Sequence, residues 1–291
     1  DRKKEISMSK IAVVTDTNSG ITNEEAEKLG VFLVPMPFIV DGTEFFEGVT
    51  CTYEHFFEIL ESGKDVSTSQ PSPSSLTETW DKILRDYDEL IYIPMSSALS
   101  SSFATAKALA SEYDGKVYVV DNKRISITQR LSVIDALNLI EKNLTASEIS
   151  SILEENALNC SIYLAVNTLE LLKKSGRVTS AGAAIASILG LKPVLQIQGE
   201  KLDAFSKARG MANAEKVMLN AAQKDLNERF KGMKVKINAA YSGEYSAAEG
   251  WLKSVRSFFN DDSIEMYKLP ISISCHVGAG VKAIGLIPEM Q

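Results

Sequence analysis

Two strings rich in hydroxyl side chains are the first candidates for chemistry in this 291-residue chain. They are Thr68-Ser69-Gln70-Pro71-Ser72-Pro73 and Ser96-Ser97-Ala98-Leu99-Ser100-Ser101-Ser102. Each lies where a loop leads into an expected helix, so backbone N–H groups without a helical partner and the positive end of a helix dipole are close by. This combination suits an anion. The two strings therefore predict recognition of a small acidic ligand through a carboxylate or phosphate group.

Two basic residues are further candidates for this site. Arg177 follows Gly176, which is expected to end a helix, so it either neutralises that helix end or binds the ligand. His276 precedes a glycine-rich segment, and near neutral pH either protonation state of its ring could bond a carboxylate or phosphate. The other histidine, His55, lies inside an expected helix and is interpreted as a surface or packing residue.

A catalytic use of the same residues is the alternative. His276 with Ser96 or Ser97 could serve a hydrolase or a phosphotransferase, whereas Cys275 next to His276 is a weak pair because sequence neighbours rarely face each other productively. The chain has no Gly-x-Ser-x-Gly motif and no Gly-x-x-x-x-Gly-Lys-Ser/Thr motif, which disfavours a hydrolase elbow and an ATP site of its own. Gly278-x-Gly280 is too short for a dinucleotide site. We therefore predict no catalytic residue and no cofactor.

The composition limits the classes of protein that remain. A chain with 45% hydrophobic and 24% charged residues is typical of a soluble globular protein. Its net charge of −7 argues against binding nucleic acid or an anionic membrane surface. The most apolar stretch, 181–191, is too short to span a bilayer. Three widely spaced cysteines disfavour a disulfide framework or a metal site and favour a reducing cytoplasm.

Strand and helix patterns alternate along the chain, which predicts an α/β fold with mainly parallel sheets. We expect two lobes, residues 9–160 and 161–291, rather than one large sheet. Polar residues follow three of the expected strands directly, at Thr15-Asp16-Thr17, Ser96-Ser97 and Asp121-Asn122. Since ligands bind beyond the carboxyl ends of strands in open α/β sheets, these loops are expected to converge on one site. Each of these residues could also be an ordinary helix cap.

Local signals place several element boundaries. Capping boxes at Thr22/Glu25 and Thr145/Glu148 predict helix starts, and Asp41-Gly42 predicts a hairpin turn. Residues 193–197 and 202–205 are expected to form a second hairpin around Gly199. The small-residue segment 181–189 is expected to be a helix that either lines a ligand tunnel or packs in the core.

The order of short motifs resembles that of the DegV family, bacterial fatty-acid-binding proteins that serve as acyl-carrying subunits of a fatty-acid kinase. The most specific motif is Thr68-Ser69-Gln70-Pro71-Ser72, and the next is Ser96-Ser97-x-Leu99-Ser100. The remaining motifs follow in sequence order: Val14-Thr15-Asp16-Thr17, Val119-Val120-Asp121, Leu172-Lys173-Lys174-x-Gly176-Arg177-Val178, Lys192-Pro193-Val194-Leu195 and His276-x-Gly278-x-Gly280. Together they cover almost the whole chain from Lys10.

The resemblance implies a long-chain fatty acid between two α/β lobes. The carboxylate would be held by Thr68, Ser69, Ser96 and Ser97, with the basic Arg177 and His276 nearby, and the acyl chain would lie in an apolar tunnel. The resemblance further implies a non-catalytic carrier that presents the fatty acid to the kinase catalytic subunit, which makes the acyl phosphate for phospholipid metabolism. Arg209 matches a family arginine expected to face that partner.

The chain departs from the family pattern at three places. Ser100-Ser101-Ser102 stands where Ser-Gly-Thr is usual, Asp121 lacks the usual following serine, and Val277-Gly278-Ala279-Gly280 replaces a common Gly-Pro-Gly ending. These departures bear on the shape of the pocket and on acyl preference, and not on membership of the family.

Overall fold

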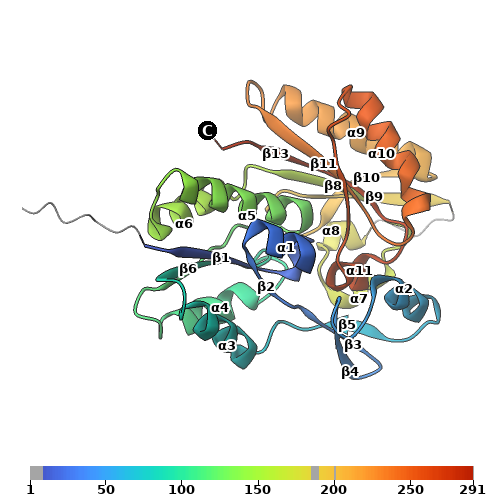
Figure 1. Cartoon of the computed structure of the whole chain (residues 1–291). Coiled ribbons are helices and arrows are strands. Elements are labelled where there is room, and N and C mark those ends of the chain that lie inside the picture. Colours follow the sequence, from blue (N-terminus) through green and yellow to red (C-terminus); the bar gives the residue numbers. More distant parts are fainter. Residues whose placement is uncertain (1–8, 185–189, 200, 291) are drawn as a thin grey trace, which may run out of the picture.

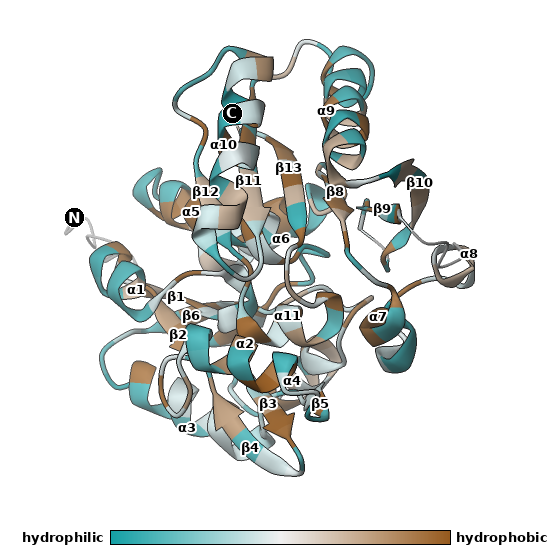
Figure 2. Ribbon diagram, turned by 90° about the vertical axis from the view of Figure 1, so that its right-hand side faces the viewer, coloured by the Kyte–Doolittle hydropathy of each residue, from teal (hydrophilic) through white to brown (hydrophobic). Residues whose placement is uncertain are grey.

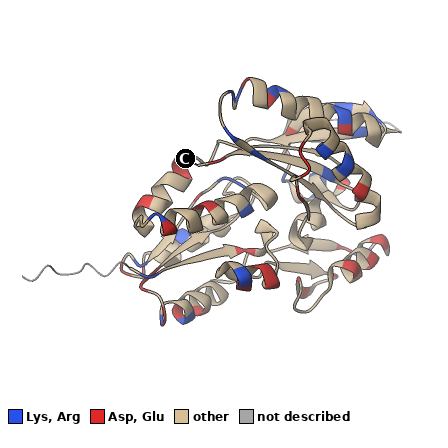
Figure 3. Ribbon diagram, turned by 45° about the horizontal axis from the view of Figure 1, so that its top comes forward, with Lys and Arg blue, Asp and Glu red and all other residues tan. Residues whose placement is uncertain are grey.

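Three β-sheets with packed helices make up the fold in the computed structural model, which describes residues 9–184, 190–199 and 201–290 (Figure 1). The α/β class is therefore confirmed. In Figure 2 the strands are mostly brown, whereas the outer side of several helices is teal, as expected when strands form the core. Charged residues of both signs are distributed over the outer helices (Figure 3). No helix among the described residues is long and apolar enough to cross a membrane.

The first sheet is parallel throughout and has the strand order β2-β1-β6-β7. Its strands are β1 (Ile11–Asp16), β2 (Phe32–Val34), β6 (Glu89–Ile93) and β7 (Val117–Val119). Apolar residues of α3 (Pro73–Ile83) and α4 (Ser102–Ala110) pack on one face. Those of α1 (Asn23–Leu29), α5 (Ser126–Glu141) and α6 (Ala146–Glu155) pack on the other. Because both faces are covered, its strands read as continuous apolar runs.

A small antiparallel sheet follows, in the order β4-β3-β5. Its strands are β3 (Pro37–Val40), β4 (Thr43–Phe46) and β5 (Val66–Thr68). The turn predicted at Asp41-Gly42 joins β3 to β4, and both of its residues have positive φ, as a tight hairpin requires. The helices α2 (Tyr53–Glu61) and α11 (Ile271–Val277) share a buried apolar cluster with this sheet.

The third sheet differs from the expected parallel arrangement. Its order is β10-β9-β8-β13-β11-β12, and among its strand pairs only β11 and β12 are parallel. The C-terminal strand β13 lies between β8 and β11 and runs antiparallel to both, which local patterns could not reveal. The strands are β8 (Ser161–Ala165), β9 (Leu191–Ile197), β10 (Asp203–Arg209), β11 (Val235–Tyr241), β12 (Met266–Lys268) and β13 (Lys282–Pro288). The hairpin expected around Gly199 is formed by β9 and β10.

Helix α5 lies between the two large sheets, as Figure 1 shows. The other face of the six-stranded sheet is covered by α9 (Met211–Asn227) and α10 (Tyr245–Phe259). At Gly285 of β13 a Cβ atom would come within 2.6 Å of Ile127 Cδ1 on α5, so a glycine permits this close approach. All strands of the first two sheets precede residue 160 and all strands of the third follow it. Helix α11, however, returns to the small sheet, and the division at 160 stays a prediction.

The local boundary signals agree well with the structure. Both predicted capping boxes form, at Thr22/Glu25 and Thr145/Glu148. Gly176 ends α7 (Glu170–Ser175) in a left-handed conformation. The helix expected over 181–189 is described only as α8 (Ser180–Ala183), since residues 185–189 lie outside the described ranges.

Candidate functional site

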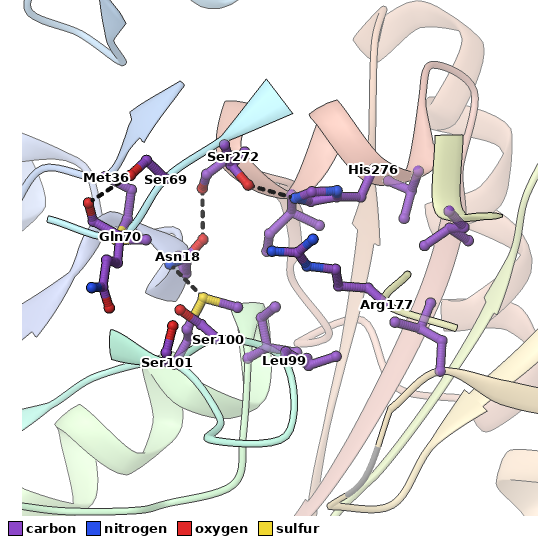
Figure 4. Close-up of a pocket in the computed structure, with 17 residues that line it drawn as sticks. Asn18, Met36, Ser69, Gln70, Leu99, Ser100, Ser101, Arg177, Ser272 and His276 are labelled. Atoms are coloured by element: carbon purple, nitrogen blue, oxygen red, sulfur yellow. Dashed lines mark hydrogen bonds between the residues drawn. The ribbon is translucent and has the colours of Figure 1, made fainter. Parts of the chain in front are cut away.

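A cavity of about 290 Å³ lies where the three sheets and α11 meet. Its lining combines polar and apolar side chains, and we refer to the polar ones as the polar wall (Figure 4). The polar lining residues are Asn18, Thr68, Ser69, Gln70, Ser100, Ser101, Arg177, Ser272 and His276. The apolar lining residues are Met36, Met95, Leu99, Ile125, Leu172, Leu202, Ile273 and Val277. Arg177 is the one charged residue, and no carboxylate lies among the described lining residues, so the cavity favours an anion.

Thr68 and His276 lie together at the polar wall, although 208 positions separate them in the sequence. Thr68 ends β5, and His276 occupies the last turn of α11. Thr68 Oγ1 and His276 Nε2 are hydrogen-bonded at 2.8 Å, and His276 Nδ1 is buried without a partner among the described residues. The short antiparallel sheet and the returning helix therefore bring two sequence-predicted residues into one site.

Arg177 lies beside His276 in the cavity (Figure 4). The sharp turn after Gly176 carries it to the wall, and its guanidinium donates to Ser175 O. Burial, and to a lesser degree the positive charge of Arg177, lowers the pKa of His276 to about 4. His276 is therefore a neutral ring near pH 7, and the single positive charge at this wall belongs to Arg177. A neutral imidazole beside a guanidinium can donate to a carboxylate without repelling the cation.

Only one of the three serines predicted to bind the carboxylate lines the cavity. Ser69 lines the cavity, but Ser96 and Ser97 do not. Ser96 is buried and accepts a hydrogen bond from Ala98 N at 3.2 Å, so it shapes the loop. Ser97 donates to the Asp121 carboxylate at 2.6 Å, outside the cavity.

In place of Ser96 and Ser97, the next turn of the same string brings Ser100 and Ser101 to the cavity. The string thus contributes to the site, but through residues four positions later. The three loops lie side by side after β1, β6 and β7: Asp121 accepts from Ser97, Asn122 Nδ2 donates to Pro94 O at 2.7 Å, and Asp16 accepts from Met95 N at 2.9 Å. None of these predicted loop residues lines the cavity itself. The pairing of His276 with Ser96 or Ser97 that an enzyme would need is not formed.

Asn18 and Ser272 also line the cavity, and neither was predicted. Ser272 Oγ donates to Asn18 Oδ1 at 2.6 Å, while Asn18 Nδ2 donates to Met95 Sδ at 3.0 Å (Figure 4). Asn18 belongs to η1 (Thr17–Ser19), directly after the Thr15-Asp16-Thr17 loop. That loop was the available signal for Asn18, whereas Ser272 follows no pattern that marks it.

A buried hydrogen-bond network fixes the position of Asn18. The Asp16 carboxylate accepts from Asn18 N and from Gln129 Nε2, both at 3.0 Å. Complete burial raises the pKa of Asp16 to about 6, although its hydrogen bonds oppose this shift. Gln129 on α5 also donates to Thr15 Oγ1 at 3.1 Å. The end of β1 is therefore tied to the helix that separates the two large sheets.

A second, apolar cavity of about 50 Å³ adjoins the first, because Ile125, Leu202, Ile273 and Val277 line both. It lies between α5 and the six-stranded sheet. Apart from Ser126, its described lining consists of hydrocarbon side chains: Ile125, Ile127, Ile162, Leu164, Ile197, Leu202, Ala240, Leu269, Ile273, Val277 and Ala283. The two cavities together offer a polar end for an anionic head and an apolar end for a hydrocarbon.

Two other arginines lie away from the cavity. Arg209 is exposed at the end of the edge strand β10, as a residue facing a partner should be, and its partner role stays a prediction. Arg124, from the segment that departs from the family pattern, is buried and donates to Ala157 O, Asn156 O, Asn159 O and Ser132 Oγ. Its guanidinium therefore satisfies backbone carbonyl groups that follow the end of α6, and it adds no positive charge to the cavity.

Comparisons with known proteins agree with this geometry. The sequence pattern of the DegV family, described as uncharacterised proteins, matches residues 10–289. This chain belongs to the DegV family. A DegV domain-containing protein of Deinococcus radiodurans is 28% identical over 282 residues, which cover 96% of this chain and 98% of the relative.

Solved structures of other proteins share the fold. A fatty-acid-binding DegV family protein from Thermus thermophilus is 26% identical, with a TM-score of 0.87 and coverage of 96% of this chain and 100% of that one. A stearic-acid-binding protein from Eubacterium ventriosum is 22% identical, with a TM-score of 0.86 and coverage of 96% and 98%, which shows likeness of fold. The DegV membership inferred from the motifs is confirmed.

Proposed function

We propose that this DegV protein binds a long-chain fatty acid across the two adjoining cavities. The carboxylate lies at the polar wall beside Thr68, Arg177 and His276, and the acyl chain extends into the apolar cavity. The observation that carries the proposal is the shared lining of the two cavities, with one cation at the polar end and hydrocarbon at the other. Ser69, Ser100 and Ser101 supply further hydroxyl donors, in place of the predicted Ser96 and Ser97.

The energetics assign different roles to the two ends. Burial of an acyl chain contributes about 0.8 kcal/mol per methylene, so fourteen methylenes give on the order of 11 kcal/mol. Association costs roughly 4–15 kcal/mol, and each charge-assisted hydrogen bond to the carboxylate contributes about 1.5–3 kcal/mol. The tail therefore supplies most of the affinity, while the polar wall sets orientation and favours a charged head group over an uncharged one.

The fatty-acid-binding family member from Thermus thermophilus supports the choice of ligand. We further propose that the protein is a non-catalytic carrier that presents the fatty acid to a fatty-acid kinase, with Arg209 facing that partner. A cytoplasmic location suits this role, and the three cysteines are free and buried, as a reducing compartment allows.

Mass spectrometry of lipid extracted from the purified protein tests the proposal. We expect a long-chain fatty acid in near-stoichiometric amount, or tight binding of added fatty acid by the delipidated protein. Protein that carries no lipid and does not bind added fatty acid would contradict it. If purified protein hydrolyses an ester and His276→Ala abolishes the reaction, the enzymatic alternative is correct instead.

A further inference from the structure

The helix α11 supplies two residues of the polar wall, Ser272 and His276, and its own sequence does little to fix its position. It is only seven residues long and carries Ser272, Ile273, His276 and Val277 to the cavity. Its N-cap residue is Pro270, which provides no side-chain cap for the helix N-terminus. A helix of two turns is unstable alone, so contacts with the rest of the molecule must hold it in place.

Three hydrogen bonds join α11 to segments from the first half of the chain. His276 bonds Thr68 on β5, Ser272 donates to Asn18 in η1, and Ile271 N donates to Glu47 Oε2 at 2.8 Å. The first two involve groups that line the cavity, and an incoming carboxylate competes for them. Glu47 does not line that cavity. Its bond to α11 is therefore the one of the three that a bound ligand leaves in place.

The loop that carries Glu47 is well braced. Val49, Thr50 and Cys51 all donate their backbone N–H to Phe46 O, and Thr50 Oγ1 accepts from Phe46 N at 2.8 Å. Cys51 shares a buried cluster with Ile271 and Cys275 of α11. The Glu47 carboxyl group thus meets the first N–H of α11 from a fixed support. Burial raises the pKa of Glu47 to about 7, although the bond from Ile271 N and the charge of Lys268 oppose this shift, so near neutral pH the group accepts the bond in both protonation states.

We propose that Glu47 is a positioning residue for the ligand: it supplies the missing N-terminal cap of α11 and so holds Ser272 and His276 at the polar wall. The effect on binding rests on the proposed function, but the same role also predicts that Glu47 fixes the position of the His276 ring in the ligand-free protein. Glu47 touches no part of the ligand, so it acts through α11 alone.

The test compares Glu47→Ala with Glu47→Gln and with Glu44→Ala, the last being an exposed glutamate on the same hairpin. Affinity is measured for hexadecanoic acid and for 1-hexadecanol, which has the same tail without the carboxylate. We expect Glu47→Ala to weaken binding of the acid about fivefold, the size of one hydrogen bond between neutral groups, and to leave the alcohol within about twofold. Glu47→Gln retains an acceptor for Ile271 N and should recover most of the affinity, whereas Glu44→Ala should match the wild type.

Nuclear magnetic resonance of the imidazole rings supplies a second readout without ligand. The chain has two histidines, His55 and His276, so one His55→Gln variant assigns both signals. Glu47→Ala should shift and broaden the His276 signal and leave His55 unchanged. An unchanged His276 signal, or equal loss of affinity for the acid and the alcohol, would overturn the inference. If the wild type binds no fatty acid but Glu47→Ala still perturbs His276, the proposed function fails and the positioning role stands.

Discussion

The polar and apolar halves of the ligand cavity are built in different ways. Side chains of the polar half come from η1, β5, α11, the Ser100-Ser101 turn and the turn that follows α7. Several of them are hydrogen-bonded to one another. The apolar half is formed mainly by α5 and the six-stranded sheet, with regular strands supplying the wall. The difference indicates that orientation depends on a few long-range contacts between loops, whereas affinity depends on the continuous hydrophobic core.

Obstruction of the apolar half should have the largest effect. Ala283 on β13 lines only the apolar cavity of the two, and Ala283→Leu adds three carbon atoms there. At about 0.8 kcal/mol per methylene, displacement of three methylenes weakens binding of hexadecanoic acid roughly 50-fold. Calorimetric titration with hexadecanoic and decanoic acid checks this, and the shorter acid should lose much less. Equal losses for both chain lengths would show that the tail does not reach this wall.

Removal of the charge from the polar half should have the next largest effect. Arg177→Met keeps much of the side-chain volume but leaves the carboxylate without its cation, so binding of hexadecanoic acid should weaken about tenfold. Binding of 1-hexadecanol should stay unchanged. Arg209→Met is the matched control, because Arg209 is exposed and outside the cavity. A similar loss in both variants would mean that general surface charge, rather than the site, attracts the ligand.

The pH dependence of the unfolding free energy should show how far His276 in the polar half is shielded from water. Burial lowers the folded-state pKa of His276 from 6.5 to about 4, so the folded protein binds fewer protons than the unfolded chain between these values. The contribution of His276 to stability is therefore complete above pH 6.5 and is lost as the pH falls toward 4.

Urea unfolding of the wild type and of His276→Gln measures this loss. Between pH 7 and pH 5 the wild type should lose about 2 kcal/mol of unfolding free energy relative to the variant. The exposed His55→Gln serves as the control and should follow the wild type. A pH-independent difference between wild type and His276→Gln would show that the ring is solvated.

The smallest expected effect separates residues of the two hydroxyl strings. Thr68→Ala removes one neutral hydroxyl from the polar wall and should weaken binding of hexadecanoic acid about threefold. Ser97→Ala should leave it unchanged, because the Ser97 hydroxyl donates to Asp121 outside the cavity. Fluorescence competition with a labelled fatty acid can resolve this difference. A larger loss in Ser97→Ala than in Thr68→Ala would show that Ser97, rather than Thr68, contacts the carboxylate.

Features marked by local sequence signals could be predicted, whereas features that depend on long-range contacts could not. Thr68, Ser69 and Arg177 could be placed because each lies beside a clear local signal, a helix start or a glycine stop. The parallel sheet was also predictable, since buried strands alternate with amphipathic helices. The antiparallel order of the six-stranded sheet was not, because the position of β13 between β8 and β11 depends on pairing across more than a hundred residues.

The different placement of the serines relative to the cavity has a similar cause. Ser96 and Ser97 begin the string, but the turn after them, with Leu99 N and Ser100 N both donating to Ser96 O, directs Ser100 and Ser101 into the cavity instead. Hydroxyl residues identify the string, while backbone geometry decides which of them faces the ligand. The same limit applies to Ser272 and Glu47, whose roles arise only when α11 packs against segments more than two hundred residues earlier.

A crystal structure with bound hexadecanoic acid would show directly whether a fatty acid occupies the two adjoining cavities. We expect the carboxylate within hydrogen-bond distance of Arg177 and of at least one of Thr68 and His276. The chain should pass Ile125 and Leu202, which line both cavities, toward Ala283. A fatty acid in the reverse orientation, or one bound outside these two cavities, would contradict it.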